Sequence, residues 1–111
     1  MNSVLEEQII ISLGSNLGDR LNALYKAIAL LEAYPISIKL LSKVYETPAW
    51  GFKGDPFYNA CVSIKTKLKP KDLLEVLLKV EKTMGRLPSK GKGYSSRTID
   101  LDLLFYKSKN I

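Results

Sequence analysis

The apolar residues of this 111-residue chain change their spacing in a set order, and that order restricts the folds open to it. Four stretches carry consecutive or alternating apolar residues, which is typical of β-strands. Two further stretches repeat apolar residues every three or four positions, as amphipathic helices do. The predicted strands are residues 8–13, 38–46, 57–64 and 99–106, and the predicted helices are residues 19–34 and 70–84.

The order strand, helix, strand, strand, helix, strand predicts an α+β fold of the ferredoxin-like type. In that fold two helices cover one face of an antiparallel sheet, and the other face stays open. Local signals agree, because Asp19 suits an N-cap, Pro70 a first helical position and Gly85 a helix end. With no internal repeat in 111 residues, we expect a single domain over residues 1–111.

The chain lacks histidine and has one cysteine, Cys61, and this removes several classes of chemistry. An internal disulfide, a thiolate zinc site, an iron–sulfur cluster and catalysis by a histidine base are excluded. Any catalytic metal must then be a hard cation held by oxygen ligands, and Mg²⁺ is the most suitable.

The charge balance indicates an anionic partner. Seventeen Lys and Arg residues against 11 Asp and Glu residues leave a net charge of +6, which suits nucleic acid or a phosphorylated small molecule. A merely solvated surface would give the same count. No apolar run is long enough to span a membrane, and the first residues lack the pattern of a signal peptide. We therefore expect a cytoplasmic protein with no membrane partner.

Asp100 and Asp102 are the strongest candidates for a metal site. Two positions apart on a strand, they lie on the same face, with α-carbons about 6.5 Å apart. Carboxylates that close repel each other unless a cation lies between them, and oxygen ligands at this spacing suit Mg²⁺. The alternative is that both side chains merely project into water from an uncovered face.

The segment before this strand is basic and rich in glycine. Residues 86–97 carry Arg86, Lys90, Lys92 and Arg97 without any acid. Glycines in and beside this segment let the backbone approach an anion closely. A carboxylate-bound metal next to a basic loop suggests a nucleoside triphosphate.

An aromatic ring and an amide are predicted beside the aspartates. The alternation at 57–64 places Phe57 and Asn59 on the open face of the sheet, which also carries the two carboxylates. A ring for stacking and an amide for paired hydrogen bonds suit a flat heterocycle. Phe57 could equally pack under the loop that precedes it, and Trp50 could anchor that loop instead of touching a ligand.

Taken together, these residues resemble the 6-hydroxymethyl-7,8-dihydropterin pyrophosphokinase family of the folate pathway. Five blocks match the family pattern in the right order through nearly the whole chain. The blocks are Leu13-Gly14-Ser15-Asn16-Leu17-Gly18-Asp19, Tyr45-Glu46-Thr47-Pro48 with Gly51, Phe57-Tyr58-Asn59-Ala60, Glu81 with Gly85-Arg86, and Arg97-Thr98-Ile99-Asp100-Leu101-Asp102. The last block is highly specific, and the first is moderately so.

The resemblance implies an enzyme that transfers the β,γ-pyrophosphoryl group of ATP to the hydroxymethyl oxygen of the pterin, releasing AMP, with two Mg²⁺ ions. It implies that Asp100 and Asp102 bind the metal and that Arg86 and Arg97 are catalytic. The implied ATP-binding residues are Glu81, Arg86, Lys92, Tyr94, Arg97 and Thr98. The implied pterin-binding residues are Thr47, Pro48, Trp50, Phe57 and Asn59.

Two departures from the family pattern bear on these expectations. Tyr94 stands where the family usually has Trp, and Lys92 and Gly93 fall near a position often held by Arg. We therefore expect the loop contacts to ATP to differ here. Family members continue beyond the equivalent of Ile111 into a segment with a His-Pro pair, an arginine and a second aromatic residue, and we expect this chain to lack that segment.

A different class of function fits the same fold and charge, namely a small basic module that binds single-stranded RNA on its open sheet face. Against it, the central strand lacks an aromatic-rich RNA-binding signature, and two aspartates would repel phosphates unless a metal were bound. A non-catalytic ligand-binding or assembly domain is the third candidate. We expect ATP and the pterin as partners and no nucleic acid, and the sequence names no protein partner.

Overall fold

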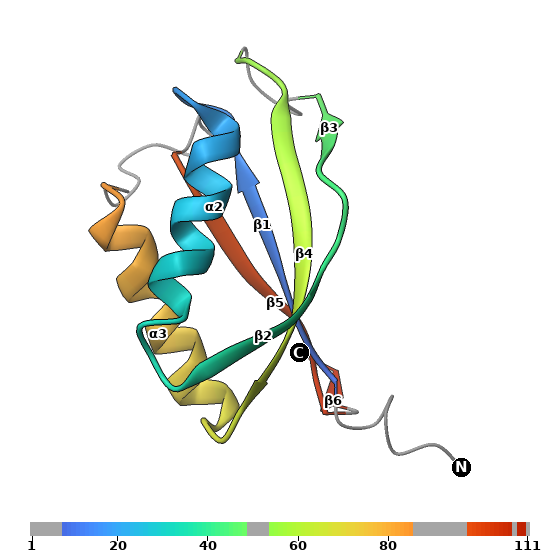
Figure 1. The fold of residues 1–111 in the computed structure, drawn as a ribbon, viewed down its shortest axis with the longest axis vertical. Coiled ribbons are helices and arrows are strands. Elements are labelled where there is room, and N and C mark those ends of the chain that lie inside the picture. The colour runs from blue at the N-terminus through green and yellow to red at the C-terminus, as the bar shows by residue number, and fades with distance from the viewer. Residues whose placement is uncertain (1–7, 49–53, 86–97, 108, 111) are drawn as a thin grey trace.

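The computed structural model describes residues 8–48, 54–85, 98–107 and 109–110 of the chain. Six strands and two helices follow one another along these residues (Figure 1). They are β1 (Ile9–Ser15), α2 (Arg20–Leu31), β2 (Ile36–Leu41), β3 (Tyr45–Thr47), β4 (Phe57–Thr66), α3 (Pro70–Thr83), β5 (Asp100–Tyr106) and β6 (Lys109–Asn110).

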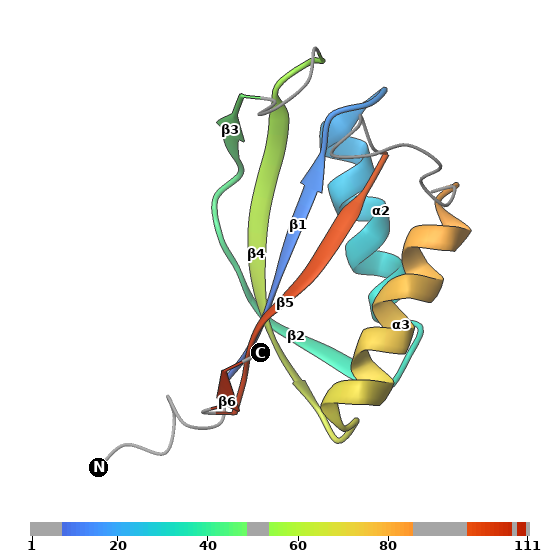
Figure 2. The same cartoon turned by 180° about the vertical axis from the view of Figure 1, so that it is seen from behind.

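The strands form one sheet with the order β2-β4-β1-β5-β6, and the short β3 pairs with β4. Every strand pair is antiparallel, and β1 lies at the centre between β4 and β5. Helices α2 and α3 lie on the same face of the sheet, as the front and back views both show (Figure 1, Figure 2). The predicted α+β ferredoxin-like arrangement is confirmed.

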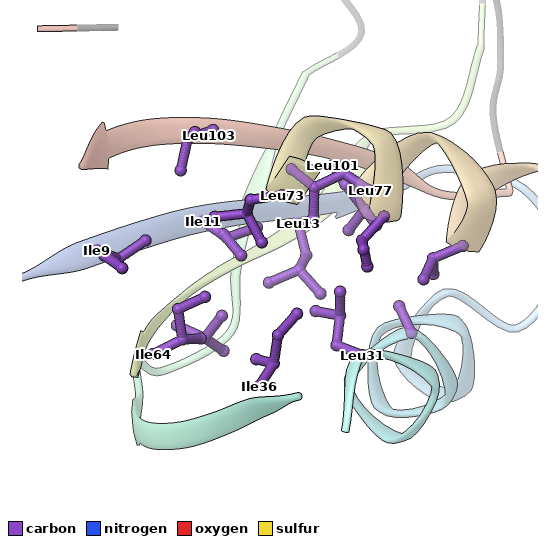
Figure 3. Packing of buried hydrophobic residues seen from close by; sticks show 14 of the residues in the cluster. Ile9, Ile11, Leu13, Leu31, Ile36, Ile64, Leu73, Leu77, Leu101 and Leu103 are labelled. Carbon is purple, nitrogen blue, oxygen red and sulfur yellow. The ribbon is translucent and has the colours of Figure 1, made fainter. Parts of the chain in front are cut away.

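The hydrophobic core lies between the two helices and the inner face of the sheet (Figure 3). Leu73 and Leu77 of α3 face Ile11 and Leu13 of β1, and each of these side chains is at most 2% exposed. Burying such a side chain contributes about 1.5–3 kcal/mol. Because the inner face of the sheet supplies this core, the outer face is left to carry other side chains.

Helix α2 begins where the sequence predicts and ends slightly earlier. Asp19 caps it, because its carboxylate accepts a hydrogen bond of 3.1 Å from the backbone N–H of Asn22. The helix ends at Leu31 and not at the predicted stop before Pro35. The backbone N–H groups of Ala33 and Tyr34 then bond to the carbonyls of Leu30 and Leu31, only three residues back, which tightens and closes the last turn.

Helix α3 begins at Pro70 and ends at Thr83, close to the predicted range. Gly85 follows it with φ at +93°, a left-handed conformation that glycine adopts without strain.

Neither helix in the described parts of the chain has the length and apolarity that a membrane crossing needs.

The single strand predicted at 38–46 is divided into β2 and β3. Ser42 lies in the gap, where its backbone N–H donates to the carbonyl of Cys61 at 2.8 Å. Its hydroxyl oxygen accepts from the N–H of Cys61, also at 2.8 Å, so a side chain replaces one backbone acceptor of the ladder. The division brings β3 alongside the first residues of β4, from Phe57 to Asn59.

Strict alternation along residues 99–106 predicts Ile99, Leu101, Leu103 and Phe105 on one side of the sheet, and for Phe105 this prediction is wrong. The alternation places Phe105 on the helix side of the sheet, but β5 has an irregular register opposite Ile10 and Ile11, where Leu104 is an extra residue. Such a bulge reverses the side of every later residue. Tyr106, which is 5% exposed, therefore takes the buried position instead.

Candidate active site

A pocket of about 580 Å³ lies over the outer face of the sheet. Strands β1, β4 and β5 contribute residues to it, and β3 with the residue that follows it contributes to one side. The lining residues are Ser12, Leu13, Gly14, Tyr45, Thr47, Pro48, Phe57, Asn59, Cys61, Asp100, Asp102 and Leu104. The prediction that the aromatic and amide pair shares a face with the two aspartates is confirmed, because all four side chains line this one pocket.

Asp100 and Asp102 form the side of the pocket that belongs to β5. They pair with Gly14 and Ser12 of the central strand, which brings both carboxylates to the pocket. Asp100 is half-buried and Asp102 is exposed. No group of three or more His, Cys, Asp and Glu side chains suited to a metal occurs among the described residues. Two carboxylates match Mg²⁺, which usually takes one or two of them and completes its shell with water and substrate phosphates.

Glu81 reaches this strand from α3 on the helix side of the sheet. It is only 4% exposed, and its Oε2 accepts a hydrogen bond of 2.7 Å from the N–H of Leu101. Leu101 stands between the two aspartates, so this bond ties α3 to β5 at the point where their carboxylates project. A buried carboxylate is costly unless it is hydrogen-bonded, and here the strand backbone supplies a donor.

Asn59 lies in the opposite side of the pocket, where hydrogen bonds fix the orientation of its amide. Its Nδ2 donates to Oγ1 of Thr47 at 2.8 Å and, more weakly, to the carbonyls of Tyr45 and Phe57 at 3.4 Å each. Because Nδ2 is engaged within this side, the carbonyl oxygen Oδ1 faces Gly14 across the strand pair. The pocket therefore presents a hydrogen-bond acceptor at a fixed place.

Gly14 also belongs to the site, a role that is not predicted from the sequence. A β-carbon at this position would lie 3.1 Å from Oδ1 of Asn59 and 3.4 Å from the ring of Phe57. A residue with a β-carbon would press on the amide of Asn59, which would have to move by a few tenths of an ångström, whereas the ring of Phe57 would be in ordinary contact. The need for glycine at this position comes from side chains of the neighbouring strand β4. The residues next to Gly14 in the sequence therefore give no sign of it.

Tyr45 and Cys61 also line the pocket and are absent from the predicted site. Partial burial, followed by the charge and hydrogen bond of the nearby Cys61 thiol, raises the pKa of Tyr45 above its ordinary value of 10.0. The phenol is therefore neutral at physiological pH. Cys61 points to the same face of β4 as Phe57 and Asn59, so the alternation of this strand is a signal that could have predicted it. Tyr45 reaches the pocket only because β3 pairs with β4, and no local pattern in the sequence predicts that pairing.

The other predicted site residues fall into three groups. Thr47 and Pro48 line the pocket. Thr98 lines a separate hollow of about 260 Å³, which also involves residues just before and within α2, and Met84, the residue after α3. The predicted residues that lie outside the described parts of the chain are Trp50, Arg86, Lys92, Tyr94 and Arg97.

Comparison with known proteins gives a family and several relatives. Residues 10–111 match the family model described as 7,8-dihydro-6-hydroxymethylpterin-pyrophosphokinase (HPPK). A folate synthesis bifunctional protein of Arabidopsis thaliana is 44% identical over 106 residues, which cover 95% of this chain and 22% of that protein. The 2-amino-4-hydroxy-6-hydroxymethyldihydropteridine pyrophosphokinase of Porphyromonas gingivalis is 41% identical over 100 residues, which cover 88% of this chain and 68% of that protein.

A third relative agrees with these matches, and a solved structure has a similar fold. The 2-amino-4-hydroxy-6-hydroxymethyldihydropteridine pyrophosphokinase of Aquifex aeolicus is 41% identical over 93% of this chain and 63% of its own length. A crystal structure of an unknown protein from Galdieria sulphuraria has a TM-score of 0.53 at 15% identity over 87% of this chain and 47% of its own, which supports the fold alone. This chain thus spans between 22% and 68% of the length of the three relatives. It belongs to the 7,8-dihydro-6-hydroxymethylpterin-pyrophosphokinase family.

Proposed function

We propose that this chain transfers the β,γ-pyrophosphoryl group of ATP to the hydroxymethyl oxygen of 6-hydroxymethyl-7,8-dihydropterin, the activity for which its family is named. The observation that carries the proposal is the single pocket in which two aspartates face an aromatic ring and an oriented amide. A cation-binding edge beside a surface for a flat heterocycle is what a reaction between a metal-bound triphosphate and a pterin needs.

The transfer takes place directly between the two substrates, so no protein side chain needs to form a covalent bond with either. The hydroxymethyl oxygen forms a bond to the β-phosphorus of ATP, the bond from that phosphorus to the α,β-bridging oxygen breaks, AMP leaves, and the hydroxyl proton is released. Catalysis of such a step consists mainly of positioning the two substrates and neutralising the phosphate charge. A chain without histidine can therefore supply what the reaction requires.

Asp100 and Asp102 are the residues we assign to Mg²⁺, and the resemblance implies two ions. Bound Mg²⁺ supplies positive charge that offsets the charge of the phosphates. The part of the two carboxylates is to hold the cations at the β5 edge of the pocket. Glu81 holds the backbone between them through Leu101, so we assign it a positioning role rather than a contact with ATP.

The opposite side of the pocket suits the pterin. Phe57 offers a ring face on which the bicyclic base can stack. Oδ1 of Asn59 is oriented to accept a hydrogen bond from an N–H group of the pterin, because its amide nitrogen is held by Thr47. Thr47 thus acts through Asn59, and Pro48 lines the pocket beside it.

The resemblance supports further roles for residues outside the described ranges. Arg86 and Arg97 are proposed to contact the phosphates, Lys92 and Tyr94 to contact ATP, and Trp50 to contact the pterin. No observation favours the single-stranded RNA alternative, because the open face presents two carboxylates where RNA phosphates would lie.

One incubation tests the proposed activity. The chain is mixed with ATP, Mg²⁺ and 6-hydroxymethyl-7,8-dihydropterin, and the nucleotide products are separated. We expect AMP and not ADP, and its formation should require both the pterin and Mg²⁺. As a matched control, 6-methyl-7,8-dihydropterin keeps the ring but lacks the attacking hydroxyl, so it should yield no AMP. Absence of AMP with the complete mixture would overturn the proposal.

A further inference from the structure

Arg20, the first residue of α2, joins three separate parts of the chain. Its Nη1 donates a hydrogen bond of 2.7 Å to the carbonyl of Pro56 and lies 3.4 Å from Oε2 of Glu46. The central carbon of its guanidinium lies 3.8 Å from the centroid of the Tyr58 ring. These three partners belong to the segment before β4, to β3 and to β4.

Asn16 adds a second bond to the same segment. It is 1% exposed, and its Nδ2 donates to the carbonyl of Asp55 at 3.1 Å. Two consecutive carbonyls, those of Asp55 and Pro56, are therefore held by the β1–α2 connection and the first residue of α2. The start of α2, β3 and the start of β4 gather at one end of the sheet in both views (Figure 1, Figure 2).

The segment that Arg20 holds leads directly into the pocket. Phe57 follows Pro56, lines the pocket, and supplies one of the carbonyls that orient the amide of Asn59. A displacement of Pro56 would therefore move the ring and loosen the amide. Arg20 itself is not among the described residues that line the pocket.

We propose that Arg20 is a positioning residue for pterin binding, acting through Pro56 and Phe57 without touching the ligand. The inference rests on the proposed function. The Arg20 side chain is only 24% exposed, so water is a poor replacement for its partners. A planar guanidinium can donate at its edge while its face covers a ring, whereas the ammonium of lysine cannot do both with one group.

The test measures the affinity for each substrate separately. Calorimetric titrations with 6-hydroxymethyl-7,8-dihydropterin, in the presence of Mg²⁺ and a non-hydrolysable ATP analogue, compare the parent chain with Arg20→Ala and Arg20→Lys. We expect Arg20→Ala to weaken pterin binding about tenfold and to change the affinity for the ATP analogue less than about twofold. Arg20→Lys should recover about half of the loss on a logarithmic scale, because one donor and the charge remain.

Two further variants keep the test decisive if Arg20→Ala unfolds. Tyr58→Leu retains apolar volume but removes the ring under the guanidinium, and it should weaken pterin binding about threefold. Lys71→Ala removes the same charge at the beginning of α3, away from the pocket, and should leave both affinities unchanged. Thermal unfolding of every variant shows that folded proteins are being compared.

The outcomes separate this inference from the proposed function. Equal pterin affinity in the parent, Arg20→Ala and Tyr58→Leu would overturn the inference alone. Parallel losses of pterin and ATP-analogue affinity would also overturn it, since a general loss of structure gives that pattern. A parent chain that forms no AMP and binds no pterin would overturn the proposed function and this inference with it.

Discussion

The two sides of the pocket are built in different ways. The side formed by β3 and β4 is neutral, and its polar groups are held by hydrogen bonds among its own members, chiefly from Asn59 to Thr47. The β5 side carries two carboxylates on a strand that is tied to a helix through Glu81. A neutral, internally bonded surface suits a rigid heterocycle, and a charged surface suits a cation. Substitutions on the two sides should therefore affect different substrates.

The largest effect is expected on the charged side. Asp100→Asn and Asp102→Asn keep the size of each side chain but remove one negative charge from the proposed Mg²⁺ site. We expect each to lower the rate of AMP formation at least about a hundredfold at saturating pterin, because metal charge stabilises the transferring phosphates. Pterin affinity measured without nucleotide should stay within about twofold of the parent.

Asp72→Asn is the matched control for these two variants. Asp72 lies in the first turn of α3 and does not line the pocket, so the same change of charge there should leave the rate unaltered. If Asp100→Asn and Asp102→Asn keep the parent rate and Mg²⁺ requirement, the assignment of the metal to β5 is wrong.

Substitution of Glu81 tests whether the helix positions the charged side. Glu81→Leu leaves the N–H of Leu101 without this acceptor, so the free energy of unfolding should fall by about 1–3 kcal/mol. Glu81→Gln retains an oxygen acceptor and should lose less. In both variants the rate should recover as the Mg²⁺ concentration is raised, because the carboxylates of β5 remain. Glu75→Gln, on an exposed part of the same helix, is the control. A rate that excess Mg²⁺ fails to recover would contradict the positioning role.

On the neutral side, Asn59→Ala removes one oriented acceptor. We expect pterin affinity to fall about tenfold, which corresponds to about 1.4 kcal/mol for one hydrogen bond to a ligand in a partly buried site. The affinity for a non-hydrolysable ATP analogue with Mg²⁺ should change little. Ser63→Ala alters the same face of β4 outside the pocket and serves as the control. A loss of ATP-analogue affinity as large as the pterin loss would remove the distinction between the two sides.

The sequence alone predicts most of this contrast, because strand parity is a local property. Alternation within β4 and β5 is enough to place Phe57, Asn59 and the two aspartates on one face. The antiparallel order of the strands then brings them into one pocket. Helix caps are equally local, and Asp19 is an example, since its carboxylate bonds to a backbone group only three residues away.

The parts that could not be predicted depend on contacts between distant residues. Gly14 matters because Asn59 and Phe57 lie across the strand pair, and neither is near it in sequence. The bulge in β5 changes the direction of Phe105 without altering the apolar pattern. Arg20 directly follows the block that ends at Asp19, and its partners are 26 to 38 positions away in the sequence, so only the fold identifies them.

The smallest expected effect concerns Tyr45, the titratable group of the neutral side whose pKa is displaced. Burial first, and then the Cys61 thiol, raise its pKa above 10.0, so the folded state holds the phenol proton more tightly than the unfolded state. The protonated phenol of Tyr45 therefore makes its full contribution to the free energy of unfolding below the unfolded-state pKa of 10.0. That contribution is lost as the pH rises through the raised pKa of the folded state. The neutral side should therefore keep its pterin affinity from pH 7 to pH 9, as far as Tyr45 determines it.

Unfolding of the parent and of Tyr45→Phe should be compared between pH 8 and pH 11. The difference in unfolding free energy should be flat up to about pH 9 and should then turn against the parent, because its unfolded state releases the Tyr45 proton first. Cys61→Ala should reduce this decline without abolishing it, since burial is the larger cause of the raised pKa. If the decline disappears entirely in Cys61→Ala, Cys61 and not burial is the main cause of the raised pKa of Tyr45. The charge of Cys61 would then matter on the β4 side of the pocket at high pH, and this side would not be neutral there.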